Sequence, residues 1–506
     1  MIKLINMYES ALEKAAHRIW DNKIGQIIKN ICMSLLFGYG ILQITYVDSM
    51  IYQTHKDAAM AKGVLAIMVI IFMLQKVRLI NLPSLITIAI YIPVLNSFLS
   101  IYRESPDLLA IYKPNGVTYL LGILMLVDFV CYKKVNPLRN IKPLPLVLYL
   151  GMIFVLLTHN NAGTGVYFVV PLLFLYMTDM TEDEWQNTVE RLCDGVLLSY
   201  IVVFYRSFTE FYPYDTERFY GCFTNIGLFG AFLTCVFMVF LYRFYSIRNT
   251  RGIKSPLYWV HWILFISLIY LMLLVNTITM VIGIFVALVV YLVYSRKKVT
   301  KEYLFRVHVL LLIIVALGVV SFVGINYYAN HSTVLEQLAY KTGDGLLYST
   351  LYRILACVGG RQVIGGGLDQ YEGALYAINE LSSGRLYIWD CYSEFFNLFG
   401  NVEGGVLVGE QTIINAHNEF VQAIYRYGYI GSMLYFSVYL YGLWNSVLNY
   451  VRYEQKTKLF EFMWLCGMIA VWMGERNSIT YPITFIGAML LYGEFKQRDK
   501  EIKQVS

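Results

Sequence analysis

The chain has 506 residues, of which 58% are hydrophobic and only 15% are charged. Soluble globular proteins carry about 25% charged residues, so this composition argues against a soluble protein. The formal net charge is +6, and many of the Lys and Arg residues lie in short connectors between apolar runs. No segment forms the basic patch that a nucleic-acid-binding protein needs, so no nucleic-acid partner is expected.

Apolar runs follow one another along most of the chain. Residues 1–30 lack the apolar core of a cleaved signal peptide and are expected to form a basic, cytosolic N-terminal segment. A bilayer core needs about 20 mostly apolar residues per helix, so the later runs predict an all-α polytopic membrane protein with about 12–14 transmembrane helices. The runs that meet or approach this length are 31–47, 63–75, 79–101, 116–132, 143–158, 165–178, 194–207, 222–245, 257–275, 277–295, 305–327, 418–449, 458–474 and 478–495.

Charged connectors give the expected orientation of these helices. Cytoplasmic loops carry an excess of Lys and Arg. All the connectors rich in these residues fall on one side of the membrane if the N-terminus is cytoplasmic: they are 133–142, 243–254, 296–301, 452–458 and 496–504. The predicted organisation is therefore a helix bundle of about 11 spans over 31–327, an extracytoplasmic loop over 328–415, C-terminal helices over 416–495 and a cytoplasmic tail over 496–506.

The loop over 328–415 is far longer than the usual connection of about 4–6 residues. It is acidic and contains two glycine clusters. Long loops are often lids or binding elements, although a loosely packed cap without chemistry is the alternative. Cys357 and Cys391 share this loop, and a disulfide between them stays open. No Cys/His spacing in the chain suggests a metal site, so neither a metal nor a cofactor is expected.

The segment after this loop holds the first candidate residue, His417. Asn415 is predicted to cap a helix whose first turn holds His417. Gly428 and Gly431 fall on the same helical face as His417 and would let another helix pack closely. The N–H groups of a helix N-terminus also favour an anion at this outer position. The alternative is a histidine that only forms hydrogen bonds at the membrane boundary.

Arginines on the same predicted face are further candidates. Arg385 lies in the acidic loop, where its planar fork of donors could bind a phosphate; a salt bridge to Asp390 or a neighbouring loop carboxylate is the alternative. Arg218 lies at the outer end of a predicted span and could instead extend to lipid headgroups. Arg353 and Arg361 also lie in the loop. Arg361 precedes a glycine run that could hold an anion or simply form a turn.

The signature around His417 resembles that of the bacterial O-antigen ligase and O-antigen/capsule polymerase superfamily. His417 and Asn418 are followed, after nine residues, by Gly428-Tyr-Ile-Gly431, similar to the family's HN-x9-GxxG pattern after its large outer loop. The stretch 384–389 (GRLYIW) is similar to its GR-x3-W pattern.

A third stretch, 218–225 (RFYGCFTN), is similar to the family's R-x-x-G-x-F-x-N pattern at an outer helix end. Two positions depart from the family. Members often carry a Ser-Arg pair at the outer start of a middle helix, but the comparable stretch here, 275–283 (VNTITMVIG), has no Arg. The last signature position, often Thr, is Ser432.

The resemblance implies a metal-independent, GT-C-like glycosyltransferase in the bacterial cytoplasmic (inner) membrane, with its active site on the extracytoplasmic face. The donor would be an undecaprenyl-diphosphate-linked glycan. The acceptor would be a second lipid-linked repeat in a polymerase, or a lipid A–core oligosaccharide in an O-antigen ligase. Bilayer lipid and other polysaccharide assembly proteins are the further expected partners.

This reaction assigns expected roles to the candidates. An attacking hydroxyl needs a general base, for which His417 is suited, and a departing diphosphate needs cations such as Arg385 and Arg218. Substrate binding is expected from four more residues: Asn418, Trp389, Arg361 and Arg353. The abundance of Ile, Tyr, Lys and Asn suggests a low-GC genome and favours a capsule or exopolysaccharide polymerase over a ligase.

Two other classes stay open. A transporter of lipid-linked oligosaccharides would also have about 12–14 spans, but it would place ionisable residues at mid-membrane depth, where the runs here contain few. A structural scaffold for polysaccharide assembly would leave the HN-x9-GxxG pattern without an explanation.

Overall fold

The structure is a computed structural model of the whole chain. Apart from isolated positions within 7–18 and 63–74, it describes residues 21–45, 141–159, 162–209, 219–223, 225–250, 254–275, 277–294, 385–401, 405–408, 411–453, 456–479 and 481–496. The predicted spans at 79–101, 116–132 and 305–327, and the loop residues 328–384, lie outside the described residues.

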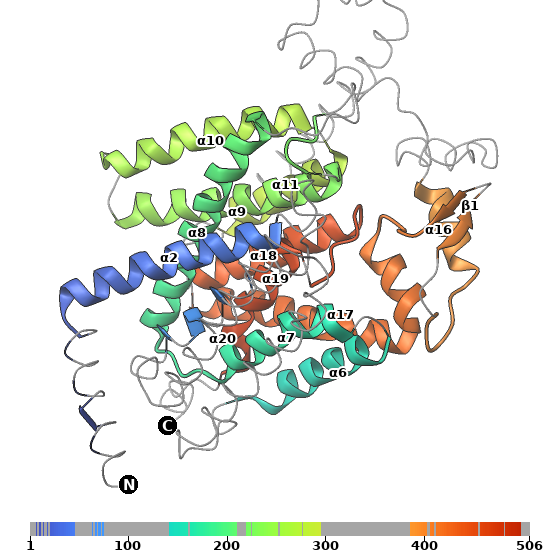
Figure 1. The fold of residues 1–506 in the computed structure, drawn as a ribbon, viewed down its shortest axis with the longest axis horizontal. Helices are drawn as coiled ribbons and strands as arrows, with labels where there is room; N and C mark the ends of the chain where they lie inside the picture. Colours follow the sequence, from blue (N-terminus) through green and yellow to red (C-terminus); the bar gives the residue numbers. More distant parts are fainter. Residues whose placement is uncertain are drawn as a thin grey trace, which may run out of the picture. The chain divides into compact units, whose positions relative to one another are not determined.

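The described part is mostly helical, and every predicted apolar run within it forms a helix (Figure 1). The helices are α2 (Lys23–Thr45), α6 (Pro143–His159), α7 (Ala162–Met177), α8 (Glu182–Thr209), α9 (Ile226–Thr250), α10 (Pro256–Val275), α11 (Ile278–Tyr294), α16 (Arg385–Ser393), α17 (Glu419–Tyr453), α18 (Lys456–Trp472), α19 (Pro482–Leu490) and α20 (Tyr492–Phe495). Four segments are long and apolar enough to cross a membrane: Lys23–Thr45, Glu182–Thr209, Ile226–Ile247 and Pro256–Val275. The prediction of a helical protein with membrane-length apolar helices is confirmed.

Three details differ from the sequence prediction. The class is not purely α, because β1 (Val406–Val408) and β2 (Gln411–Ile413) form an antiparallel hairpin. The predicted span 478–495 is divided into α19 and α20 at Leu491. Helix α8 begins at Glu182, well before the predicted run at 194–207. The reason is a capping box, in which the Thr181 backbone N–H donates to Glu184 (2.9 Å) and the Glu184 N–H donates back to the Thr181 hydroxyl (3.3 Å).

The chain divides into two compact units, one comprising Met1–Tyr205 and Ile479–Ser506 and the other Arg206–Ser478. In the first unit, α2 and α8 approach closely through glycines. A Cβ on Gly195 would clash with Phe37, and one on Gly38 would lie 3.1 Å from the Cβ of Leu198. Small residues let helix backbones pack closely where lipid provides no hydrophobic drive.

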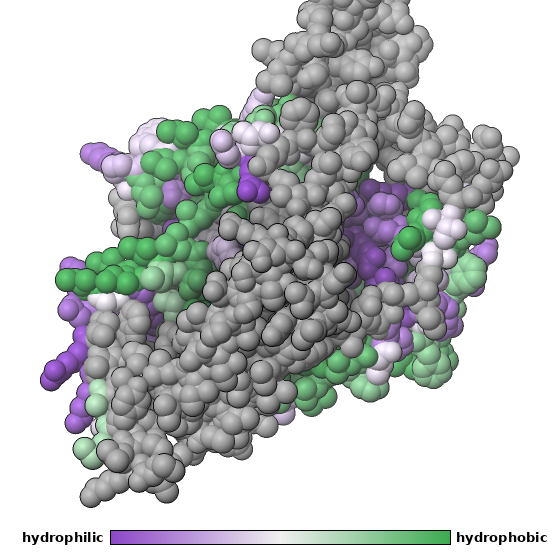
Figure 2. Space-filling model, viewed as in Figure 1, coloured by the Kyte–Doolittle hydropathy of each residue, from purple (hydrophilic) through white to green (hydrophobic). Residues whose placement is uncertain are grey.

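In the second unit, α9 lies beside α10 and α11, and α18 packs against α9, α11 and α17 (Figure 1). Most of the side chains of α9 are buried. Helix α10 exposes a face of large apolar and aromatic side chains that includes Trp259, Val260, Ile263 and Ile266. Figure 2 shows green patches among paler side chains over this part of the surface. An apolar exposed face of this kind is expected of a helix that meets lipid.

A small domain in the same unit combines α16, the β1–β2 hairpin and the start of α17. Its shared core is formed by Ile388, Tyr392, Val406, Val408, Ala416 and Tyr425. The Tyr392 hydroxyl donates to the Ile413 carbonyl oxygen at 2.8 Å. Burial raises the pKa of Tyr392 to about 12, so the hydroxyl stays protonated and keeps this donor role at neutral pH.

Helix α17 is broken at Gly428, where φ is 69° and ψ is 179°. The sequence predicted that Gly428 would admit a neighbouring helix. Instead, its α-carbon faces the backbone of the loop 395–401, and a Cβ there would clash with the Leu398 carbonyl group. The prediction that Gly428 contacts a neighbouring helix is therefore wrong, because the segment that packs closely against it is this loop. Gly431, in the next part of α17, is buried.

Candidate functional site

His417 lies in a four-residue turn between β2 and α17, which we call the His417 turn (residues 415–418). The backbone of His417 is left-handed, with φ at 50°. Its N–H donates to the Asn415 side-chain oxygen at 3.0 Å. Helix α17 is capped by Asn418, whose side-chain oxygen accepts from the N–H groups of Phe420 (2.9 Å) and Val421 (3.1 Å). The prediction that Asn415 caps this helix is therefore wrong by three positions, and His417 precedes the helix.

Side chains from other segments hold this turn in place. The Ala416 N–H donates to the Gln422 side-chain oxygen at 2.9 Å, and the Trp389 indole N–H donates to the Ala416 carbonyl oxygen, also at 2.9 Å. The Asn418 side-chain amide donates to the Met473 carbonyl oxygen at 3.0 Å. Trp389 and Asn418, both predicted to bind substrate, thus use these polar groups to position the backbone around His417.

The loop after α18 brings a carboxylate to His417. Glu475 Oε1 lies 3.2 Å from His417 Nδ1, and the Glu475 side chain is only 2% exposed. The loop is also tied to the start of α17, because the Glu419 carboxylate accepts from the Asn477 backbone N–H at 3.0 Å. A buried carboxylate against one imidazole nitrogen fixes the ring's orientation and tautomer.

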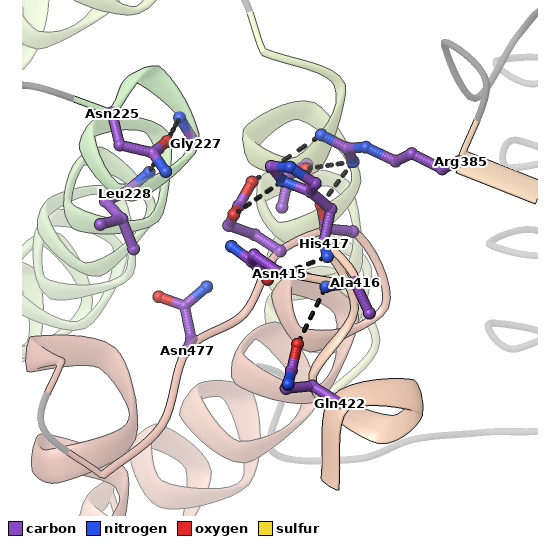
Figure 3. Close-up of polar contacts among 12 residues, drawn as sticks. Asn225, Gly227, Leu228, Arg385, Asn415, Ala416, His417, Gln422 and Asn477 are labelled. Atoms are coloured by element: carbon purple, nitrogen blue, oxygen red, sulfur yellow. Dashed lines mark hydrogen bonds and ion pairs between the residues drawn. The ribbon is translucent and has the colours of Figure 1, made fainter. Parts of the chain in front are cut away.

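Arg385, the first residue of α16, contacts the same carboxylate. Its guanidinium lies 3.7 Å from Glu475 Oε2 and donates to the Gly474 carbonyl oxygen. Figure 3 shows Arg385 and His417 turned toward one another from different segments. The sequence left open a salt bridge from Arg385 to Asp390 or another loop carboxylate. The structure shows an ion pair, but its partner is Glu475, which lies outside the loop.

Helix α9 leaves room for the Glu475 carboxylate at a glycine. Asn225 precedes the helix, and its side-chain oxygen accepts from the N–H groups of Gly227 (2.7 Å) and Leu228 (3.3 Å) (Figure 3). A Cβ on Gly227 would clash with Glu475 Oε2. Gly227 is therefore required for the position of the carboxylate, because any larger side chain would displace it.

The stretch 275–283 also reaches the site. Thr279 Oγ1 donates to the Gly474 carbonyl oxygen at 3.1 Å and lies 3.5 Å from an Arg385 guanidinium nitrogen. This is the stretch in which the resembling family often carries an arginine. Here the guanidinium of Arg385, from a distant part of the sequence, lies against it.

The arrangement is suited to moving a proton. When Nδ1 carries a proton and forms a hydrogen bond to Glu475, the lone pair of Nε2 is free to accept a second proton. The carboxylate then stabilises the imidazolium that forms. His417 is 29% exposed, so a substrate can reach the ring. Arg385 supplies positive charge on the other side of the carboxylate.

The structure brings four predicted site residues together: His417, Arg385, Asn418 and Trp389. Three others, Arg218, Arg353 and Arg361, lie outside the described residues and stay predictions. Cys391 is a free thiol, whose pKa is raised by burial, and Cys357 lies outside the described residues. In the described part of the chain, no group of three or more His, Cys, Asp or Glu residues could hold a metal ion.

Glu475 is the site residue that the sequence analysis missed. It lies in the connector ERN (475–477), between the predicted runs 458–474 and 478–495 and on the outer face of the predicted topology. A short outer connector that carries Glu, Arg and Asn next to one another was the available signal. Nothing in the sequence pattern pairs this connector with a histidine 58 positions earlier.

We predict that Trp389→Phe, which keeps an aromatic ring but removes the indole N–H, modestly lowers both stability and reaction rate. The buried Ala416 carbonyl group would lose its indole donor, at a cost of about 1–3 kcal/mol in stability. Loosening of the His417 turn should lower the rate of any reaction in which His417 transfers a proton by roughly tenfold, equivalent to about 1.4 kcal/mol. Melting in detergent and the initial rate measure the two effects. Trp259→Phe, on the exposed face of α10, is the control, and equal effects from both variants would contradict the prediction.

The sequence matches no family model, and no characterised protein is similar enough to be matched to it.

Proposed function

We propose that this protein is a membrane glycosyltransferase that polymerises undecaprenyl-diphosphate-linked oligosaccharide repeats into a surface polysaccharide, such as a capsule, an exopolysaccharide or O-antigen. The observation that supports this most is the pairing of His417 with the buried Glu475 next to Arg385. These residues come from three separate segments, and two of them belong to the patterns shared with the O-antigen ligase and polymerase superfamily.

In the proposed step, a sugar hydroxyl oxygen of the acceptor attacks the anomeric carbon of the donor glycan. The bond from that carbon to the diphosphate oxygen breaks, and its electron pair leaves with the diphosphate. The hydroxyl proton passes to Nε2 of His417, while Glu475 stabilises the charged ring. In this proposal, positive charge from Arg385 and Arg218 stabilises the diphosphate as it departs.

The proposed setting is the bacterial cytoplasmic (inner) membrane, with about 12–14 spans, both termini in the cytoplasm and a GT-C-like arrangement in which the 328–415 loop faces outward. The four membrane-length apolar helices support the membrane part of this proposal. The site residues lie at helix ends, beside the N-termini of α9 and α17 and the C-terminus of α18, as expected at a membrane face.

An O-antigen ligase would use the same site with a different acceptor, so the product distinguishes the two enzymes. Wild type, His417→Ala and Arg385→Ala would be expressed at matched membrane levels in a strain that lacks the native gene, and the surface glycan would be separated on a gel. A polymerase predicts a long-chain ladder from wild type and single repeats from both variants.

Full-length polymer left on the lipid carrier by both variants would instead identify a ligase. Normal glycan from both variants would contradict the proposed site and favour a transporter of lipid-linked oligosaccharides. Trp259→Phe again serves as the control for expression and insertion, since its side chain lies on the exposed face of α10.

A further inference from the structure

The loop 395–401 connects α16 to the hairpin and carries an apolar surface. Its sequence, FFNLFGN, contains no charged residue. Phe395 is 49% exposed and Leu398 is 57% exposed, although both lie beside a well-packed core. Exposed apolar side chains that cluster in this way usually mark a surface that meets another apolar phase.

The apolar surface continues along α17. Beyond the break at Gly428, one face of the helix remains exposed and consists of apolar and aromatic side chains: Tyr429, Ile430, Met433, Leu440 and Trp444. Met433 is the most exposed of these, at 74%. At about 3.6 residues per turn, all five fall on one side of the helix. The loop therefore extends a helix face that, in the proposed topology, meets lipid.

The backbone of the loop is tied into the break in α17. The N–H groups of Tyr429 and Ile430 donate to the carbonyl oxygens of Asn397 (3.0 Å) and Leu398 (3.3 Å). In return, the Asn401 backbone N–H donates to the Tyr425 carbonyl oxygen at 2.9 Å. The loop thus supplies acceptors and a donor that an unbroken helix would have supplied by itself.

Two asparagine side chains bind further backbone groups of the loop. The side-chain oxygen of Asn397 accepts from the N–H groups of Phe399 (2.9 Å) and Gly400 (2.6 Å). The side-chain amide of Asn401 donates to the carbonyl oxygens of Phe395 and Tyr425, both at 2.9 Å. These hydrogen bonds pair backbone groups of the loop with partners inside the protein, which backbone needs in a medium poor in water.

From these observations we infer that the loop 395–401 docks into the outer leaflet of the bilayer, with Leu398 among the acyl chains just below the headgroups. Helix α17 from Tyr429 to Tyr453 would span about 37 Å at 1.5 Å per residue. That exceeds a hydrocarbon core of about 30 Å, so the outer end of α17 and the loop fall at the headgroup boundary. This inference rests on the proposed course of α17 across the membrane.

Docking at this depth would fix the height of the candidate site above the membrane. Arg385 begins α16, which leads directly into the loop, and His417 lies just before α17, whose break receives the loop. The site is therefore connected to the membrane surface through both of these elements. A lipid-linked diphosphate is confined to that same surface, so the docked loop would hold the site at the height of its substrate.

The test places the photoreactive residue p-benzoylphenylalanine at one position at a time in the full chain, reconstituted in phospholipid vesicles without lipid-linked glycan. Leu398 is the tested position. Met433 is the control for α17 in lipid, and Leu407, 65% exposed on β1, is the matched control for an exposed leucine outside the surface. After illumination, mass spectrometry measures the fraction of protein attached to phospholipid.

We expect positions 398 and 433 to give at least fivefold more phospholipid adduct than position 407. If position 433 gives phospholipid adduct but position 398 gives no more than position 407, the loop does not dock, although α17 still lies in the membrane. If positions 398 and 433 both give no more phospholipid adduct than position 407, the inference and the proposed course of α17 are both overturned. Crosslinks from 398 to a second copy of the chain, without phospholipid adduct, would identify the surface as a protein interface and also overturn it.

Discussion

Glu475→Gln is expected to lower the rate of the proposed glycan polymerisation by about 10²–10⁴-fold, as much as His417→Ala. The change keeps the size of a side chain that is 2% exposed, so the fold should persist. It removes the charge that stabilises a protonated His417 and offers an amide that can set the wrong tautomer. It also removes the negative partner of Arg385. The initial rate of chain extension by purified protein on a lipid-linked repeat measures the loss.

The double variant His417→Ala/Glu475→Gln shows whether Glu475 acts through His417 or independently of it. If Glu475 acts through His417, the double variant should be no slower than the slower single variant, since a missing ring needs no orientation. Multiplied losses would show that the two residues act separately and would contradict the pair. Asp390→Asn makes the same carboxylate-to-amide change within α16, the helix that begins with Arg385, and its rate should stay within about twofold of wild type.

Gly227→Ala is expected to cost about 10²-fold or more in rate without changing a polar side chain of the site. The added methyl group would occupy the position of Glu475 Oε2, so the carboxylate must move away from His417 and Arg385. A displacement of about 1 Å can cost that much in a catalytic arrangement. Alanine also favours a helix by up to about 1 kcal/mol over glycine, so the variant should remain folded.

The matched control is Gly467→Ala in α18. A Cβ there would meet the sulfur of Met238 at 2.7 Å, at the flexible end of a side chain that can shift. Initial rates and melting temperatures of both variants should be measured together. Equal rates for Gly227→Ala and Gly467→Ala would contradict the requirement for a glycine opposite Glu475.

The helices could be predicted from the sequence because each depends on a local property, an apolar run of membrane length. Local sequence patterns predicted helix bounds and contacts less well where one residue pattern fits two different structures. The acidic first turn of α8 lowered its hydropathy, although Thr181 and Glu184 form a strong helix start. Gly428 lies in an apolar run and looked like a contact between helices, whereas its positive φ breaks α17.

The candidate site was predicted only in part, for a different reason. His417 and Arg385 stood out because of their residue types, their positions and a family resemblance. Their partners did not stand out. Glu475 lies 58 positions after His417 in the sequence, and Thr279 lies 106 positions before Arg385. Such pairs are decided by how the helices pack, so the sequence offered only Asp390 or a neighbouring loop carboxylate as a partner for Arg385. The roles of Arg218, Arg353 and Arg361 stay predictions.

The positive φ of His417 has a thermodynamic consequence. A left-handed backbone costs a residue with a Cβ roughly 1–2 kcal/mol, a cost that glycine avoids. The protein thus spends folding stability to keep an imidazole at this position. His417→Gly should therefore melt at a higher temperature than His417→Ala while being equally inactive. A search for more thermostable variants that ignores activity would then select against the histidine on which the proposed chemistry depends.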